Sequence, residues 1–179
     1  GQASGLVAAN GSTGRGILVG AGWVESDHNI KLDMTQEDTG FTFEGWVYPR
    51  SDSVPTHDYL FSKHHPQIIR VILDSCTEVE YSFFNHANNE TVWKFDGGLR
   101  CDEWQHVAAT YDGETMRWFV NGNLIDSYSG ASGGMQINEE PVYIGGNWEN
   151  PNEGFTGYMD EVRIWAKALT SNEINQVKG

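Results

Sequence analysis

The sequence predicts a single all-β domain over residues 1–179, a two-sheet antiparallel β-sandwich or jelly roll with a short C-terminal helical turn. Two observations predict it. About ten short runs alternate apolar and polar residues, which is the period of a half-buried strand. The chain also contains 21 Gly, 7 Trp, 7 Tyr and 8 Phe, a composition that favours strands joined by tight turns.

The clearest strand is Phe41–Tyr48, which alternates throughout and ends at Pro49. Two hairpins follow from Asp112-Gly113 and Asn121-Gly122, because both central positions of a type I′ turn need positive φ. Residues 11–22 and 130–134 are glycine-rich and predict loops, and residues 168–174 predict the helical turn. The other predicted strands are residues 59–63, 68–73, 79–84, 91–95, 105–111, 116–120, 124–128, 142–144 and 158–165.

The charge of the chain excludes several kinds of partner. Eleven Lys and Arg against 25 Asp and Glu give a formal charge of −14, so the chain lacks the basic surface that nucleic acids and anionic membranes require. An acidic protein suits Ca²⁺ and neutral ligands instead. No apolar run approaches the roughly 18 residues of a membrane-spanning helix, and we expect no membrane insertion. The start, Gly1–Ser4, has no signal-peptide pattern, so we expect any leader to have been removed.

The two cysteines, Cys76 and Cys101, are 25 residues apart. A disulfide between them would stabilise the fold by about 3 kcal/mol in the chain-entropy model. Two buried thiols are the alternative. The acidic, aromatic-rich composition favours a secreted or cell-surface protein, and therefore the disulfide.

Four blocks of sequence carry a resemblance to a known family: FTFEGWVYP (Phe41–Pro49), EWQHVAATYDG (Glu103–Gly113), MRWFVNG (Met116–Gly122) and GFTGYMDEVRIW (Gly154–Trp165). Together with residues 168–174, they resemble laminin-G-like, concanavalin-A-like jelly-roll domains from about residue 17 to residue 176. The resemblance implies the fold. It leaves the function open, because lectins, adhesion modules, pentraxins and glycanases share this fold.

Several aromatic and basic residues of these blocks are expected to be structural. Trp46, Trp104, Trp118 and Trp165 stand in apolar runs, and each is expected to bury on the order of 200 Å² in the core. His106 stands inside the run from Trp104 to Val107 and is expected to be a hydrogen-bonded structural histidine, not a metal ligand.

The resemblance implies a structural Ca²⁺ at Asp160, because related jelly rolls bind one through an acid at the start of the last long strand. Carbonyl oxygens from the irregular backbone at Gly20 and Gly22 are expected to complete the site, since Ca²⁺ takes about six to eight oxygens. The alternative is that Asp160 caps a turn and Glu161 faces solvent.

Glu78 and Glu80 lie on one side of a predicted strand, as the two carboxylates of a retaining glycosidase do. The Glu-x-Asp-x-x-Glu arrangement of glucanases with this fold fails, because Glu80 and Phe83 stand at its second and third positions. A solvated strand face is the better interpretation. The nucleophile motif Gly-x-Ser-x-Gly is absent as well. We therefore expect no enzymatic activity.

The loop around Trp148 is the candidate ligand site. Trp148 has no alternating apolar neighbours and is flanked by three amides, Asn147, Asn150 and Asn152. Aromatic rings stack on the C–H faces of sugars, and amides satisfy sugar hydroxyls. His57 and Asp58 could lie at the same end of the sandwich or at the opposite one. A Trp148 side chain buried beneath the loop is the alternative.

We therefore predict a non-catalytic, extracellular, lectin-like module whose partner is a glycan or another cell-surface ligand. It would be part of a larger adhesin or polysaccharide-active protein, beside other domains. A protein–protein adhesion module without sugar affinity is the alternative, and a contiguous exposed apolar patch would favour it. A small glycanase is the third candidate.

The Trp148→Ala variant is expected to fold normally and to lose glycan binding, because the stacking surface is removed. Glycan-array binding, with circular dichroism as the folding control, measures this. Retained affinity in a folded variant would remove Trp148 from the site.

Overall fold

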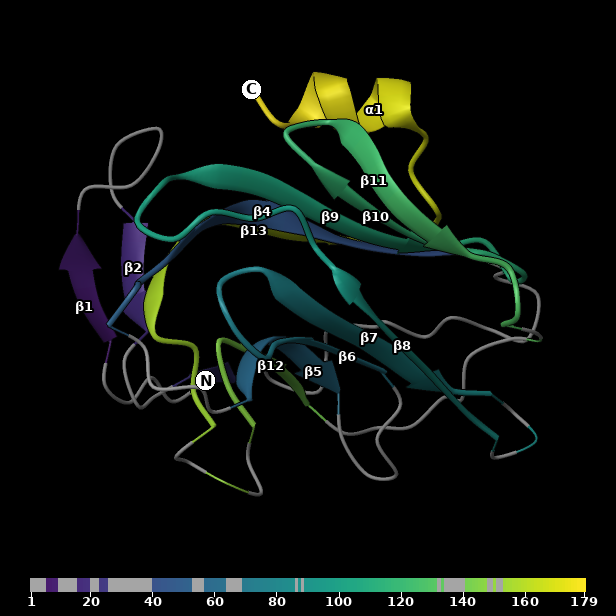
Figure 1. Ribbon diagram of the computed structural model, residues 1–179, viewed down its shortest axis with the longest axis horizontal. Helices are drawn as coiled ribbons and strands as arrows, with labels where there is room; N and C mark the ends of the chain where they lie inside the picture. The colour runs from purple at the N-terminus through teal and green to yellow at the C-terminus, as the bar shows by residue number, and fades with distance from the viewer. Residues whose placement is uncertain are drawn as a thin grey trace.

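The chain forms two antiparallel β-sheets that lie face to face, with one helix on the outside of the larger sheet (Figure 1). This arrangement comes from a computed structural model, and it confirms the predicted sandwich. The structure describes residues 6–9, 16–19, 23–25, 40–52, 57–63, 69–85, 87, 89–131, 133, 141–147, 150 and 153–179.

The larger sheet has seven strands, paired in an order that differs from their order along the chain. In sheet order they are β1 (Leu6–Ala9), β2 (Gly16–Val19), β13 (Gly157–Trp165), β4 (Phe41–Pro49), β9 (Gln105–Tyr111), β10 (Met116–Val120) and β11 (Asn123–Tyr128).

The smaller sheet has six strands. In sheet order they are β3 (Val24–Glu25), β12 (Val142–Ile144), β5 (Asp58–Lys63), β6 (Ile69–Leu73), β7 (Glu78–Phe84) and β8 (Glu90–Asp96). All ten predicted strands are present, with ends that differ by one residue at most. The helix α1 (Ser171–Val177) begins after the capping residue Thr170, whose hydroxyl accepts a hydrogen bond from the Glu173 backbone.

The predicted loop at residues 11–22 is wrong in part, because Gly16–Val19 forms β2 and pairs with β13 and β1. A strand of four residues is too short to show a period. Its pairing is therefore fixed by the neighbouring strands.

The two predicted hairpin turns differ. Asn121 (φ 51°) and Gly122 (φ 80°) both have positive φ and join β10 to β11 in two residues, as a type I′ turn requires. At the other turn only Gly113 has positive φ, at 97°. The Asp112 carboxylate instead accepts hydrogen bonds from the backbone N–H groups of Glu114 (3.1 Å) and Thr115 (2.8 Å). This side-chain turn replaces the predicted type I′ geometry.

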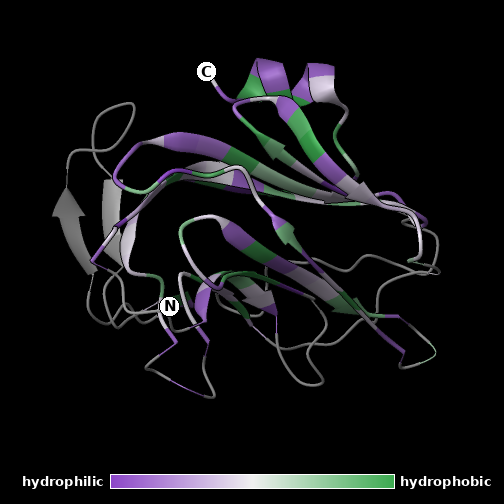
Figure 2. Ribbon diagram, in the orientation of Figure 1, coloured by the Kyte–Doolittle hydropathy of each residue, from purple (hydrophilic) through white to green (hydrophobic). Residues whose placement is uncertain are grey.

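The core lies between the sheets, and Figure 2 shows the change from hydrophobic to hydrophilic residues along the strands that face it. Trp118 is fully buried there, and its indole N–H donates to the Gly97 carbonyl at 2.9 Å. The predicted core position is confirmed for this residue. The other large, fully buried core side chains are Phe41, Phe43, Leu60, Phe61, Leu73, Tyr81, Phe83, Tyr111 and Phe155.

Trp46, Trp104 and Trp165 are only half-buried, so their predicted place in the sandwich interior is wrong. Trp46 precedes the fully buried Val47 on β4, and alternation places its side chain on the outer face of the sheet. Its indole N–H donates to the Lys178 carbonyl at 3.2 Å, beyond α1.

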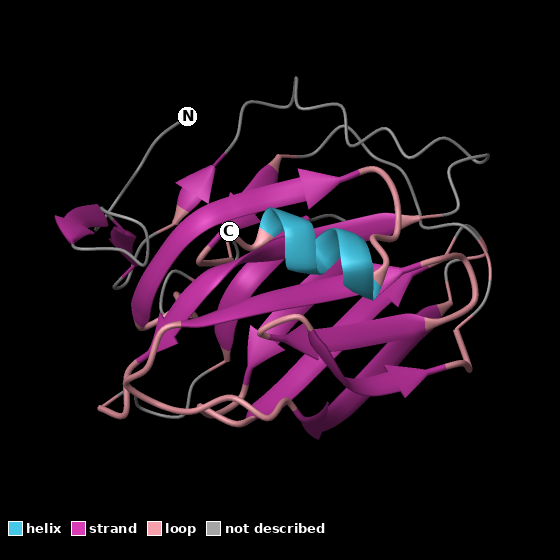
Figure 3. Ribbon diagram, turned by 90° about the horizontal axis from the view of Figure 1, so that it is seen from above, coloured by secondary structure: helices cyan, strands magenta, loops and turns pink. Residues whose placement is uncertain are grey.

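Helix α1 crosses this outer face (Figure 3). Ile174 packs there against Ala108 and Phe119. Beside this contact His106 and Glu44 are both fully buried, with 2.7 Å between His106 Nε2 and Glu44 Oε2. The structural role predicted for His106 is therefore confirmed, although its Nδ1 atom has no hydrogen-bond partner.

A disulfide joins Cys76, in the turn between β6 and β7, to Cys101, in the connection from β8 to β9. The predicted disulfide is confirmed, and the alternative of two buried thiols is wrong. The bond ties the end of the smaller sheet to the segment that enters the larger one. Among the described residues, no helix is long and apolar enough to cross a membrane.

Replacing both cysteines, Cys76→Ser with Cys101→Ser, is expected to lower the free energy of unfolding by about 3 kcal/mol, because the unfolded chain regains the entropy of an open loop. Denaturant unfolding of the oxidised protein and the double variant measures this. Equal stabilities would contradict the expected contribution.

Candidate ligand-binding site

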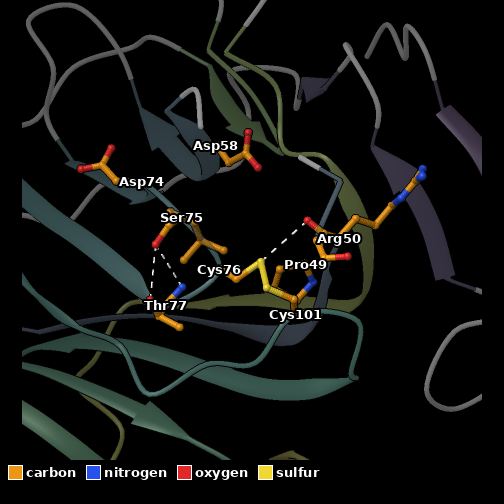
Figure 4. A pocket seen from close by; sticks show the side chains of 10 residues that line it. Pro49, Arg50, Asp58, Asp74, Ser75, Cys76, Thr77 and Cys101 are labelled. Atoms are coloured by element: carbon orange, nitrogen blue, oxygen red, sulfur yellow. Dashed lines mark hydrogen bonds between the residues drawn. A yellow bond between two sulfur atoms is a disulfide. The ribbon is translucent and has the colours of Figure 1, made fainter. Parts of the chain in front are cut away.

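A hollow of about 360 Å³ opens at one end of the sandwich. Three strand ends meet there: β4 ends at Pro49, β6 ends at Leu73, and β5 begins at Asp58. The turn Asp74–Thr77 and Cys101 complete the lining (Figure 4). The hollow therefore depends on both sheets and on the disulfide between them.

The bottom of the hollow is apolar. The disulfide lies beside Pro49 and Leu73 in its lining, and Cys76 Sγ lies 3.7 Å from the Arg50 carbonyl oxygen. Asp58 and Asp74 lie on the opposite side of the hollow from the disulfide (Figure 4). A ligand in this space would meet an apolar surface on one side and carboxylates on the other.

Both carboxylates are held in place by neighbours. Asp58 is 6% exposed, and its Oδ2 accepts a hydrogen bond from the Thr156 backbone N–H at 3.4 Å. Asp74 lies between two basic groups, with 3.1 Å from its Oδ1 to His57 Nδ1 and 3.0 Å from its Oδ2 to Lys94 Nζ. This support fixes the carboxylates before any ligand arrives.

Lys94 also contacts Glu80, with 2.7 Å between Nζ and Oε2. Its hydrogen bonds to Glu80 and Asp74 raise its pKa, so the ammonium group stays charged. Glu80 accepts a second charged hydrogen bond, from Arg70 Nε at 3.0 Å, and is 5% exposed. The predicted solvated strand face is therefore confirmed for the exposed Glu78 and wrong for Glu80. Cross-strand pairing explains the difference, because Glu80 lies directly between Lys94 and the β6 strand that carries Arg70.

The rim of the hollow is closed by hydrogen bonds to Asp102. The Asp102 backbone N–H donates to the Pro49 carbonyl at 2.7 Å, and the Ser51 N–H donates to Asp102 Oδ1 at 3.1 Å. Hydrogen bonds from Ser51 lower the pKa of the Asp102 carboxyl. The guanidinium of Arg50 pairs with Asp52 and points away from the disulfide (Figure 4).

The predicted ligand loop meets this end of the sandwich. Glu153 accepts hydrogen bonds from the side-chain amides of Asn147 and Asn150, both at 2.9 Å. Thr156 then connects the loop to the hollow, because its N–H reaches Asp58 and its carbonyl accepts from the Arg50 N–H at 3.2 Å. Trp148 and Asn152 lie outside the described residues.

The structure therefore brings together His57, Asp58 and the loop of Asn147 and Asn150, which the sequence left unplaced. Asn147 is 3% exposed and braces the loop through Glu153. The sequence analysis missed Asp74 and Ser75 as lining residues. The sequence could have indicated them, because they directly precede Cys76 and the predicted disulfide brings that turn to Cys101.

Of the predicted calcium ligands, Asp160 is described, whereas Gly20 and Gly22 lie outside the described residues. Asp160 is half-buried at an irregularity of β13, and its Oδ1 accepts a hydrogen bond from the Glu161 N–H at 2.9 Å. Within the described ranges, no three His, Cys, Asp or Glu side chains are grouped so as to hold a metal ion.

The pKa of Asp102 offers a test of the rim. In Ser51→Ala it is expected to rise, because the first cause of its lowering is the Ser51 side chain. The folded-state pKa is lowered, so this interaction stabilises the fold above the ordinary pKa and is lost as the pH falls through the lowered one. Carboxyl-detected NMR titration measures the pKa, with Glu173, held at about 2 by Lys167 and Thr170, as the unchanged control. An unchanged Asp102 pKa would contradict the contribution of the Ser51 hydroxyl.

A family match covers most of the chain. The family described as the Concanavalin A-like lectin/glucanases superfamily, a laminin-G type, matches residues 20–175. Pappalysin-1 of Mus musculus and of Homo sapiens are both 32% identical to the chain over 76 residues, or 40% of it. The matched part is only 5% of the mouse protein and 4% of the human one.

Solved structures share the fold at low sequence identity. Domain 4 of AbnA, an extracellular arabinanase of Geobacillus stearothermophilus in complex with arabinotriose, has a TM-score of 0.72 at 17% identity, over 98% of this chain and 82% of that one. The binding domain of Paraclostridial Mosquitocidal Protein 1 has a TM-score of 0.74 at 17% identity, over 99% and 46%.

A heptameric SAP-like pentraxin of Limulus polyphemus has a TM-score of 0.57 at 16% identity, over 79% of this chain and 70% of that one. The two-sheet architecture and these similarities agree with the family match. The chain therefore belongs to the Concanavalin A-like lectin/glucanases superfamily, as a laminin-G-like jelly roll.

Proposed function

We propose that this binding module is extracellular and non-catalytic, and that it recognises neutral glycans in the hollow beside the Cys76–Cys101 disulfide. The observation that carries the proposal is a hollow of about 360 Å³ with an apolar bottom and two supported carboxylates, Asp58 and Asp74. This volume is in the range of small-molecule sites, which run from about 300 to 1,000 Å³.

The chemistry of the lining suits a sugar. A pyranose or furanose ring has one face of C–H groups, which can lie on Pro49 and the disulfide. Its hydroxyl groups can donate to the carboxylates, and hydrogen bonds to a charged acceptor are the stronger kind. The apolar contact and the hydroxyl contacts are thus supplied from opposite sides.

The charges around the hollow favour a neutral ligand. Arg50, which lines the hollow, is paired with Asp52, and Lys94 beside it is paired with Asp74 and Glu80. The whole chain carries a formal charge of −14. A sulfated or sialylated glycan would therefore approach an acidic surface without an available cation in the lining.

The structural neighbours support a binding role. The arabinanase domain is in complex with arabinotriose, and other neighbours are described as receptor binding domains of botulinum neurotoxins. Ligand binding by this fold in those proteins supports a saccharide or cell-surface ligand here. The disulfide supports an oxidising compartment, and thus a secreted or surface location.

The pairing of the carboxylates supports a non-catalytic role. Glu80 contacts Arg70 and Lys94, and Asp74 contacts Lys94 and His57. These contacts occupy the carboxylate oxygens, whereas a glycosidase needs a carboxyl group placed to donate a proton to the glycosidic oxygen.

A glycan array of the purified domain tests the proposal, once with millimolar Ca²⁺ and once with EDTA. The wild type is expected to bind a neutral glycan class. Asp58→Asn and Asp74→Asn are expected to weaken that binding about tenfold or more, since each removes a charged acceptor. Asp126→Asn, an equal charge change on the exposed strand β11, is the matched control. A blank array from folded protein would contradict the proposal.

One observation favours protein–protein adhesion as a second candidate. Strand β11 is a sheet edge exposed along its whole length, and it carries Leu124, Ile125 and Tyr128 at 52%, 40% and 37% exposure. Such an edge is suited to contact another protein. A blank array with a folded domain would favour this candidate.

Calcium at Asp160 is a further part of the proposal, supported by the family resemblance and by the half-buried carboxylate on β13. Among the described residues Asp160 belongs to no group of three His, Cys, Asp or Glu side chains that could hold a metal, so carbonyl oxygens and water would provide most of the ligands. EDTA is expected to lower the melting temperature, and Asp160→Ala is expected to abolish that difference. Scanning calorimetry measures both. If EDTA still lowers the melting temperature of the variant, calcium binds elsewhere. If EDTA does not change the melting temperature of the wild type, the proposal of a structural calcium is contradicted.

A further inference from the structure

A second hollow, of about 290 Å³, opens at the same end of the sandwich as the first. It lies where β9 begins and where the hairpin of β10 and β11 turns. Its lining includes Gly98, Arg100, Trp104, Asn121, Asn123 and Ile125.

The lining of the second hollow is mainly polar and includes one aromatic residue, Trp104. The half-buried ring of Trp104 is held edgewise by Tyr48, with ring centroids 5.7 Å apart, and lies 6.3 Å from Tyr158. The exposed amide of Asn123 and the Arg100–Glu103 pair supply polar groups. That pair is loose, with 3.6 Å between the charged atoms and side chains 75% and 56% exposed. The two opposite charges offset each other, so the pair offers polar groups to a neutral ligand without a net positive charge.

The backbone of the second hollow is fixed. Gln105, which is buried, accepts a hydrogen bond from the Arg100 N–H at 3.2 Å and donates one to the Arg100 carbonyl at 2.8 Å. The position of the segment before β9 is therefore set without a ligand. A site on a fixed backbone loses less entropy on binding than one on a loose loop.

The two hollows share one segment of chain. Cys101 lines the first, and its neighbours Arg100, Glu103 and Trp104 line the second. The turn that separates the hollows is held by the disulfide and by the hydrogen bond from the Asp102 N–H to the Pro49 carbonyl at 2.7 Å. The hollows thus lie on the two sides of one fixed turn.

From this juxtaposition we infer that the two hollows are subsites of one extended site, and that the ligand is a neutral oligosaccharide that crosses the Cys101–Asp102 turn. This inference rests on the proposed function and adds the length of the ligand to it. One sugar residue fits the first hollow, and the affinity rises when further residues reach Trp104 and Asn123. A lone monosaccharide is a poor ligand.

The test uses ladders of neutral oligosaccharides, from one to six units of arabinan, xylan, galactan and β-glucan, titrated by calorimetry into the intact domain. The association constant is expected to increase at least tenfold between one unit and four. A ladder that binds with equal affinity from one unit upward would overturn the extended site and leave the proposed function standing. No binding to any ladder would overturn both.

Two variants test whether the increase in the association constant with oligosaccharide length comes from the second hollow. Asn123→Ala is expected to reduce the gain with chain length about three- to tenfold, since it removes one or two hydrogen bonds from an exposed side chain. Trp104→Ala is expected to reduce it further, with a thermal melt to check the fold. Asn89→Ala, at the opposite end of the sandwich where β7 turns into β8, is the matched control with the wild-type gain. If the association constant still increases with oligosaccharide length as in the wild type in both Asn123→Ala and Trp104→Ala, the assignment of the second subsite is overturned.

Discussion

The Cys76–Cys101 disulfide is the constraint on which the candidate site depends. It joins the β6–β7 turn to the connection that carries the chain from β8 to β9, so one covalent bond fixes the ends of both sheets. The first hollow has this bond as its bottom, and the second lies across the next few residues. Loops on a β-sandwich usually vary in position. Here the bond and the Asp102 hydrogen bonds hold the end of the sandwich in one arrangement.

Charge pairing gives this end its chemical character. A chain of ionic contacts runs over the smaller sheet, from His57 through Asp74, Lys94 and Glu80 to Arg70. In this network Lys94 is shared between Asp74 and Glu80, and Arg70 is shared between Glu80 and Glu90. A separate buried pair, His106 with Glu44, lies beneath α1 on the outer face of the larger sheet. The two sheets thus place their paired ionisable groups differently, one beside the candidate site and the other under the helix.

Most of the fold could be predicted from the sequence, and much less of the site. Strands such as β4 and β9 alternate over seven or more residues, whereas β2 and β3 have four and two residues and no period to detect. Trp104 shows the main limit. Its apolar neighbours in the sequence predicted a position in the core. A tryptophan beside the end of a strand can also pack against apolar residues on the outer face of the sheet. Only the ring contacts with Tyr48 and Tyr158 distinguish this outer position from a core position. Asp58 and Asp74 come together through register and the disulfide, which local sequence does not encode.

NMR mapping of the bound oligosaccharide tests the central claim most directly. The ¹⁵N-labelled domain would be titrated with the neutral oligosaccharide that gives the strongest array signal. The account predicts that the largest amide shifts cluster at Arg50–Asp52, Asp58, Asp74–Thr77 and Arg100–Gln105, around the two hollows. Shifts concentrated at Asp126–Tyr128, the part of β11 outside the second hollow, or on the outer face of the larger sheet near α1, would contradict it.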